Sequence, residues 1–306
     1  MAINLMVASG FKPGAILKAL RACAAHIAGC RLAIPVGLLV AALSLIDAAL
    51  ATTAHQSRQS PHLLPTRSDI TTACSKPLYL TLDTGNMASA ELIAEILNKH
   101  QVKASFFLAN ERTPWGNFAL DEAWAPYWRE RVREGHAFGN HTYDHVYFPP
   151  QPASDSPGQD KGFKARPQFG EHAGKTQLWT GEQLCKELGR VASRFESMTG
   201  TGLSNWWRAP GGKASEAAFA AARHCGYQHV HWASAGFLGD ELPSERFSNA
   251  ALLKKALDQI RPGDILMAHL GIWSRKEAFA PSLDPLIAGL KSKGFCFRTL
   301  KDHPAY

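Results

Sequence analysis

The chain has 306 residues and a net charge of +7, and its composition is 45% hydrophobic and 19% charged. These values exclude a disordered chain, a collagen and a coiled coil, and the length suits one large domain or two ordinary ones. No Lys/Arg-rich run with interleaved aromatic residues occurs, which argues against nucleic acid as a partner.

The first fifty residues have the order of a signal peptide. Basic residues within 1–31 precede the apolar run 32–46, and small residues with an A-x-A cleavage site at 49–51 follow. The apolar run is shorter than the ~20 residues of a spanning helix, and Pro35 interrupts it. We therefore expect residues 1–51 to be a signal peptide or an uncleaved N-terminal anchor, the latter being the chain's one route to a membrane. Either would export the rest of the chain to the periplasm or the extracellular space.

Residues 52–73 are polar, contain two prolines and are expected to be a linker before a domain at 74–306. In that domain, helical patterns lie between most of the β-rich runs, which are 77–82, 103–109, 136–140, 205–209, 227–233, 264–270 and 295–300. This alternation predicts parallel strands with helical crossovers, arranged as an open doubly wound sheet or as a barrel. Segment 146–178, rich in Pro and Gly, does not fit the alternation, and we expect a long functional loop there.

The clearest helical pattern covers residues 181–199, where Thr180 and Gln183 form a capping-box signature. A second pattern lies at 90–100, with Leu92 expected on the buried side, and a third follows Asn249 as its N-cap.

Polar side chains follow several of the predicted strands. Asp83 follows the first strand, His141 and His145 the third, Arg208 the fourth, and His269 ends the sixth. In parallel α/β folds these strand ends meet at one edge, and convergence from several strands favours a barrel. On a helical turn, residues four apart lie on one face, so the first two histidines can bind one metal ion. Each residue alone has an ordinary structural interpretation, but together they indicate a site.

These motifs, in this order, resemble the NodB-homology polysaccharide deacetylase family. L-T-L-D-T-G-N resembles the family's first motif, T-F-D-D-G, and H-T-Y-D-H matches the second, H-[ST]-x-x-H. R-A-P-G-G resembles the third motif, R-x-P-[YF]-G, and G-D-I-L-M-A-H-L resembles the fifth, which ends on a histidine. The fourth motif, D-x-x-D-W, is not recognisable in W-A-S-A-G-F-L-G-D-E. The resemblance extends from about residue 76 to residue 300.

The resemblance implies a distorted (β/α)7 barrel that hydrolyses an N-acetyl amide on an amino sugar of a cell-envelope or extracellular polysaccharide. It implies one divalent metal, zinc or a similar cation, with His141 and His145 as ligands. Asp83 would be the general base that takes a proton from the attacking water, and Arg208 would orient its carboxylate. His269 would be the general acid that protonates the leaving amine.

The resemblance also implies that the N–H of Gly211 helps to stabilise the oxyanion and that Met267 lines the pocket for the acetyl methyl. Two positions depart from the family. Thr84 stands where the family has a second Asp that binds the metal, and glycine stands at 211 where the family has an aromatic residue.

A hydroxyl is a weaker ligand than a carboxylate, so three alternatives stay open at Thr84. Asp83 itself binds the metal and another group acts as base, or His141 and His145 hold the metal weakly with waters, or the protein binds no metal and is a carbohydrate-binding barrel without catalysis. A separate alternative within the enzyme class is a deformylase or another amide hydrolase acting on a smaller molecule.

Four of the six cysteines follow the leader, and none forms a C-x-x-C pair. Export favours disulfides over free buried thiols. A closed barrel makes its first and last strands neighbours, so we expect a Cys74–Cys296 bond. Cys185 and Cys225 lie on consecutive predicted helices, so we expect them to form the second bond.

Overall fold

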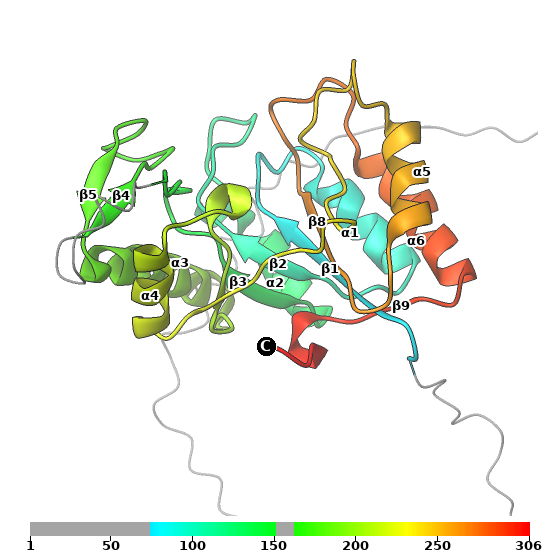
Figure 1. Cartoon of the computed structure of the whole chain (residues 1–306), viewed down its shortest axis with the longest axis horizontal. Helices are drawn as coiled ribbons and strands as arrows, with labels where there is room; N and C mark the ends of the chain where they lie inside the picture. The colour runs from blue at the N-terminus through cyan, green and yellow to red at the C-terminus, as the bar shows by residue number, and fades with distance from the viewer. Residues whose placement is uncertain (1–73, 151–161) are drawn as a thin grey trace, which may run out of the picture. The chain divides into compact units, whose positions relative to one another are not determined.

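The computed structural model describes residues 74–150 and 162–306 (Figure 1). The predicted leader at 1–51 and linker at 52–73 lie outside the described residues. Within the described ranges, no helix is both long enough and apolar enough to cross a membrane.

The described domain is built on a seven-stranded parallel sheet, with strand order β7-β6-β3-β2-β1-β8 and β9 paired to β1. Each strand falls within or just beyond one of the seven predicted β-rich runs, so the α/β prediction is confirmed. The strands are β1 Pro77–Asp83, β2 Ser105–Leu108, β3 Ala137–Asn140, β6 Trp206–Trp207, β7 Gln228–His229, β8 Ile265–His269 and β9 Cys296–Phe297.

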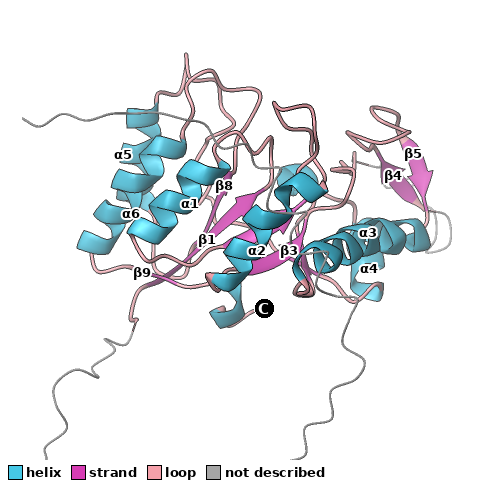
Figure 2. Cartoon of the chain, turned by 180° about the vertical axis from the view of Figure 1, so that it is seen from behind, coloured by secondary structure: helices cyan, strands magenta, loops and turns pink. Residues whose placement is uncertain are grey.

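Helices connect the strands and cover the sheet. Figure 2 shows α1 and α2 in front of the strands, with α5 and α6 towards one end of the sheet and α3 and α4 towards the other. Their apolar sides form the core with β1 and β2, whose leucine and phenylalanine side chains are almost fully buried. The helices are α1 Ala90–Lys99, α2 Ala125–Arg133, α3 Gly181–Thr199, α4 Glu216–His224, α5 Asn249–Gln259 and α6 Leu283–Ser292.

The two edges of the sheet are linked by the segment that follows β7 rather than by a regular ladder. The amide of Ala233 donates to the carbonyl of Ile265 at 3.0 Å. The amide of Met267 donates to Gly236 at 2.9 Å, and its carbonyl accepts from Leu238 at 3.2 Å. The parallel sheet is therefore barrel-like but is not closed by a regular ladder, and one irregular seam along β8 bridges its edges.

Two details of the helix predictions are wrong. Ser248, not Asn249, is the N-cap of α5, and its hydroxyl accepts from the amide of Ala251. The Asn249 side chain instead donates to the carbonyl of Ala278 at 2.9 Å. Leu92 is 39% exposed, because Ile93, Ile96 and Leu97 form the buried side of α1. The capping box of α3 is confirmed, with both of its hydrogen bonds present.

The segment 146–178 is only partly a loop. It contains an antiparallel hairpin of β4 Phe163–Ala165 and β5 Gln177–Trp179, which Figure 1 shows at the end of the sheet where α3 and α4 lie. Phe148, Phe163 and Trp179 are buried against those helices. These aromatic side chains thus form a second small core together with α3 and α4, a signal that the Pro- and Gly-rich composition concealed.

Both predicted disulfides are present. Cys74 and Cys296 join the start of β1 to β9 with a Cα–Cα distance of 5.9 Å. Cys185 on α3 and Cys225, the C-cap of α4, have a Cα–Cα distance of 5.3 Å. The predicted neighbourhood of the first and last strands is confirmed, but through pairing of β9 with the first two residues of β1 and not through closure of a barrel, because the edges of the sheet meet beside β8.

Candidate active site

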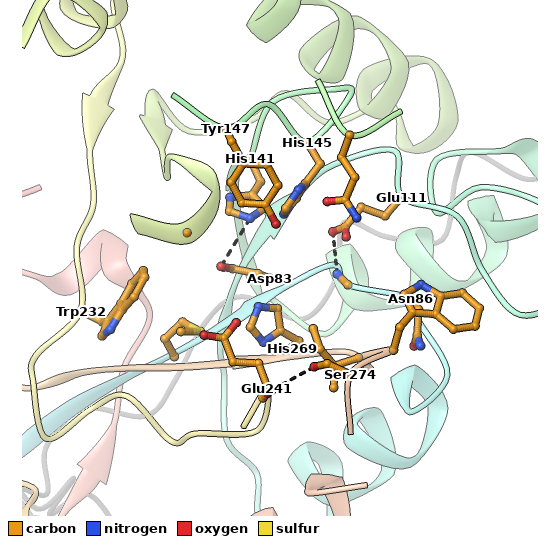
Figure 3. A pocket seen from close by; sticks show the side chains of 16 residues that line it. Asp83, Asn86, Glu111, His141, His145, Tyr147, Trp232, Glu241, His269 and Ser274 are labelled. Carbon is orange, nitrogen blue, oxygen red and sulfur yellow. Dashed lines mark hydrogen bonds and ion pairs between the residues drawn. The ribbon is translucent and has the colours of Figure 1, made fainter. Parts of the chain in front are cut away.

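A cavity of about 260 Å³ opens at the carboxyl ends of β1, β3 and β8 (Figure 3). The structure brings six of the seven residues proposed from the sequence to its wall, and the seventh, Arg208, lies fully buried behind Asp83. Parallel strands explain this convergence, because their last residues share one edge. The six lining residues are Asp83, His141, His145, Gly211, Met267 and His269.

Asp83, the last residue of β1, is held as a carboxylate. Its Oδ1 accepts a hydrogen bond from Nη1 of Arg208 at 2.6 Å, and both side chains are almost fully buried. Burial acts to raise the pKa of Asp83, but the charges of Arg208, His141 and His269 outweigh it, so the pKa lies below its ordinary value. The Arg208 guanidinium is itself packed against the ring of Phe107 at 4.2 Å.

His141 is fixed in one orientation and kept neutral. Its Nδ1 donates to the carbonyl of Arg208 at 2.9 Å, which leaves Nε2 as the nitrogen with a free lone pair. That Nε2 lies 3.6 Å from Oδ2 of Asp83 (dashed in Figure 3). Burial lowers the pKa of His141 to about 3, despite the opposing effect of Asp83. A neutral imidazole with a fixed tautomer is the form that binds metals.

The two histidines are not on a helix, so that part of the sequence argument is wrong. Residues 141–145 form a turn in which Thr142 and His145 have φ values of +63° and +47°. The turn is held by the Thr142 hydroxyl, which accepts from the amide of Val146 at 2.7 Å. It still places the rings of His141 and His145 with centroids 4.9 Å apart. Such left-handed conformations of non-glycine residues often mark functional sites.

His269, at the end of β8, is held by a carboxylate that the sequence analysis did not identify. The imidazole Nδ1 lies 3.2 Å from each carboxylate oxygen of Asp240, and the backbone amide of His269 donates to Oδ2 of Asp240 at 2.7 Å. Burial acts to lower the pKa of His269, but Asp240, with smaller contributions from Asp83 and Glu241, raises it to about 10. The imidazole is therefore protonated at neutral pH.

Thr84 does not contribute its hydroxyl to the cavity. Its Oγ1 donates to the carbonyl of Phe107 at 3.2 Å and accepts from the amide of Ala109 at 2.8 Å. Both partners belong to the backbone of β2 and the residue that follows it, and the side chain is fully buried. The position that carries a metal-binding carboxylate in the family is therefore structural in this chain.

The donors present fit a divalent metal in part. His141 offers a neutral Nε2, and Nδ1 of His145 is buried with no hydrogen-bond partner in the part of the chain that the structure describes. Two such imidazoles suit zinc and similar cations. Thr84 does not fit, and among the described residues no three His, Cys, Asp or Glu side chains already stand in a metal-binding arrangement. The two histidines would hold a metal, and a further donor has to come from elsewhere.

Two carboxylates of the wall escaped the sequence analysis because no motif marks them, Glu111 on the side of the histidine pair and Glu241 on the side of His269 (Figure 3). Trp232, at the end of the fifth predicted strand, and Tyr147, an aromatic residue of segment 146–178, also line the cavity. A Cβ added to Gly211 would lie 3.5 Å from the ring of Tyr147. The Tyr147 ring therefore packs next to the place where an aromatic side chain at 211 would begin.

Comparisons with known proteins agree with this geometry. The model of the family "Polysaccharide deacetylase" matches residues 71–230. The peptidoglycan-N-acetylmuramic acid deacetylase PdaA of Bacillus subtilis is 27% identical over 229 residues, which cover 74% of this chain and 71% of that protein. The chitooligosaccharide deacetylase of Azorhizobium caulinodans is 26% identical over 234 residues, which cover 73% of this chain and 92% of that protein.

Solved structures share the fold. A family 4 acetyl xylan esterase from Clostridium thermocellum, in complex with a cobalt ion, superimposes with a TM-score of 0.55 at 20% identity, over 74% of this chain and 89% of that one. The family model covers more than half of the 306 residues, from before β1 to just beyond β7. The chain therefore belongs to the polysaccharide deacetylase family and is a hydrolase of the type that acts on carbon–nitrogen bonds.

Proposed function

We propose that this protein hydrolyses the N-acetyl amide of an amino sugar in a cell-envelope or extracellular polysaccharide, with a divalent metal held by His141 and His145. One observation carries the proposal. Two groups facing the same cavity each have a buried partner of opposite charge, Asp83 with Arg208 at 2.6 Å and His269 with Asp240 at 3.2 Å, which favours a carboxylate at the first and an imidazolium at the second. Such a pair is what an acid–base reaction on an amide requires.

The protein's own groups divide the work. Asp83, fixed by Arg208, is placed to accept a proton from the attacking water. His269, charged by Asp240, is placed to donate a proton to the amide nitrogen as the carbon–nitrogen bond breaks, so that acetate and a free amine leave. When bound, a divalent cation supplies polarisation of the carbonyl and a lower pKa for water.

Other wall residues suit the acyl group. Gly211 has a φ of +69° in a short helical turn and exposes backbone rather than a side chain to the cavity, which supports a role for its N–H beside a developing oxyanion. Met267 and Trp232 supply apolar surface for a methyl group.

Acetate release from N-acetylglucosamine oligomers tests the proposal. We expect chelator-sensitive release by the full chain, and loss of both release and bound metal in His141→Ala. The matched control is His224→Ala, because His224 is an exposed residue at the end of α4 and does not line the cavity. Full release by the His141→Ala variant, or by chelated protein, would contradict the proposal.

The position of Thr84 favours a second candidate function, a carbohydrate-binding barrel without catalysis. Its hydroxyl is committed to backbone groups, so the family's second carboxylate has no direct substitute at that position. This candidate predicts binding of the same oligomers, measured by calorimetry, with no acetate released at any metal concentration.

We also propose that the protein works outside the cytoplasm, in the periplasm or extracellular space. Two disulfides within the described domain support this, because such bonds persist in oxidising compartments. Fractionation of cells producing the full chain, with a thiol-labelling assay of the four cysteines, tests it. Reduced cysteines in a cytoplasmic fraction would contradict it.

A further inference from the structure

Trp273 is an exposed tryptophan at the rim of the candidate active site. It lies in the loop that follows β8, and it belongs to the cavity wall while remaining 60% exposed. Within 74–150 and 162–306, no aromatic ring and no Lys or Arg cation stacks on its indole. A large apolar side chain that lines a cavity and leaves most of its surface in water is suited to contact a ligand.

A second exposed tryptophan shows that exposure alone does not set Trp273 apart. Trp115 is 62% exposed, and single exposed apolar residues are ordinary on protein surfaces. Trp115 does not line the cavity, however, and its ring packs beside that of Trp124 with centroids 5.6 Å apart. Of the two, only Trp273 combines exposure with a place in the cavity wall.

The backbone on both sides of Trp273 is fixed to other parts of the wall. Before it, the carbonyl of Gly271 accepts from the amide of Asn86, in the turn after β1, at 2.9 Å. After it, the hydroxyl of Ser274 donates to the carbonyl of Glu241 at 2.9 Å (dashed in Figure 3). The indole is therefore presented by a segment with little freedom to move, which lowers the entropic cost of binding a ligand.

Arg275 strengthens this attachment. Its side chain belongs to a residue that is only 6% exposed. The guanidinium donates to the carbonyls of Leu242 and Phe247 and to the side-chain oxygen of Asn249. All three acceptors lie in the segment between the seam along β8 and α5. A buried charge thus holds the loop that carries Trp273 against that segment, and the rim of the cavity is built before any ligand arrives.

The size of the cavity places most of a polymeric substrate on its rim. The volume of about 260 Å³ lies below the ~300–1,000 Å³ of pockets that enclose a drug-sized ligand. A chain of several sugar rings is larger than that, so the units that flank the acetylated one have to lie outside, against exposed wall residues. Among the described wall residues, Trp273 is the one large apolar side chain that is more than half exposed.

We propose that Trp273 binds the sugar unit next to the one that is deacetylated, with its indole stacked on the apolar face of that ring. The contact removes apolar surface of both rings from water and leaves the sugar hydroxyls at the edge, in solvent. It makes the site prefer chains of sugars to single sugars, because a lone sugar in the cavity has no neighbour to reach Trp273. The inference rests on the proposed function for the identity of the ligand, but it gives Trp273 a part in binding and none in the chemistry.

The N-acetylglucosamine tetramer and the single sugar test this inference on the full chain. Acetate release is measured with zinc, and binding is measured by calorimetry with chelator present. We expect Trp273→Ala to raise KM and Kd for the tetramer about 2- to 10-fold, the range for an aromatic ring in contact with another ring, with kcat unchanged. Trp273→Phe keeps a smaller ring and is expected to lie between Trp273→Ala and the wild type.

Two controls separate binding of a neighbouring sugar from other effects. Trp115→Ala removes an equally exposed tryptophan outside the cavity wall, so we expect it to handle the tetramer as the wild type does. The single sugar is expected to respond to no variant. If the wild type does not turn it over, the criterion is the rise of KM on the tetramer at constant kcat. Both tryptophans are exposed, so thermal unfolding of each variant is expected to resemble that of the wild type.

Three results would overturn the inference. Trp273→Ala could bind the tetramer as the wild type does, Trp115→Ala could weaken it equally, or the tetramer and the single sugar could be weakened by the same factor. In each case, acetate release by the wild type would leave the proposed function standing. Binding of the tetramer that depends on Trp273, without any acetate release, would keep the inference and end the proposed function. A wild type that neither binds nor cleaves the tetramer would overturn both.

Discussion

Replacing Asp240 with asparagine removes the charge that keeps His269 protonated. The change is small in shape, and the asparagine Oδ1 can still accept the hydrogen bond that the His269 amide now donates at 2.7 Å. The imidazole would remain buried but lose its main counter-charge. We therefore expect Asp240→Asn to fold normally and to act through the pKa of His269.

The size of the effect follows from that pKa. The rise from 6.5 to about 10 corresponds to about 5 kcal/mol in favour of the charged imidazole. Without Asp240 the pKa of His269 falls towards its ordinary value of 6.5, because burial is then opposed only by Asp83 and Glu241. At a pKa of 6.5 the protonated fraction is about 30-fold smaller at pH 8 than in the wild type, but only about 1.3-fold smaller at pH 6.

The assay is kcat/KM for acetate release between pH 5 and pH 10. In the wild type, activity that needs protonated His269 is present below its pKa and is lost as the pH rises through about 10. In Asp240→Asn this loss of activity at high pH is expected to move down by up to about 3.5 pH units. Titration of the histidine ring signals by NMR measures the same pKa directly and needs no substrate.

Two results would refute this reasoning. The loss of activity at high pH in Asp240→Asn could coincide with that of the wild type, or activity could fall by the same factor at every pH while the NMR titration of His269 stayed unchanged. The first result would show that protonation of His269 does not determine the loss of kcat/KM at high pH. The second would show that Asp240 has a purely structural role.

Two further predictions concern stability, measured by chemical or thermal unfolding. Arg208→Met leaves Asp83 buried without its cation, so we expect a loss of about 3–5 kcal/mol at pH 7. The loss should shrink as the pH falls and Asp83 takes up a proton, and an equal loss at pH 4 would contradict the ion-pair explanation. Cys185→Ser with Cys225→Ser opens a crosslink with a sequence separation of 40, so the chain-entropy estimate is about 4 kcal/mol. An unchanged unfolding midpoint would show that this bond does not stabilise the fold.

The strands and the core of the site were predictable because they depend on local patterns. Runs of β-branched and aromatic residues between helical segments located every strand of the main sheet, and parallel topology then brought Asp83 and His269 to one edge. The register confirms this, since these two residues are paired directly across β1 and β8. The disulfide between Cys74 and Cys296 followed from the same topology.

What the sequence did not reveal depends on side-chain direction and on loops. Asp240 lies in a segment with no recognisable motif, and only the seam beside β8 brings it to His269. Glu111 is one of many glutamates until the loop after β2 places it in the cavity. The direction of the Thr84 side chain depends on backbone groups of another strand, which residue type alone does not predict. The β4–β5 hairpin was missed because proline and glycine dominate the segment around it.

The most direct test of the account is to measure the rate of acetate release as Zn²⁺ is added to metal-free protein. We predict that the metal-free chain releases no acetate from N-acetylglucosamine oligomers and that the rate rises until one zinc ion per chain is present, with no further rise beyond that point. A full rate without metal, or no release at any zinc concentration by a folded protein that binds these oligomers, would contradict metal-dependent deacetylation.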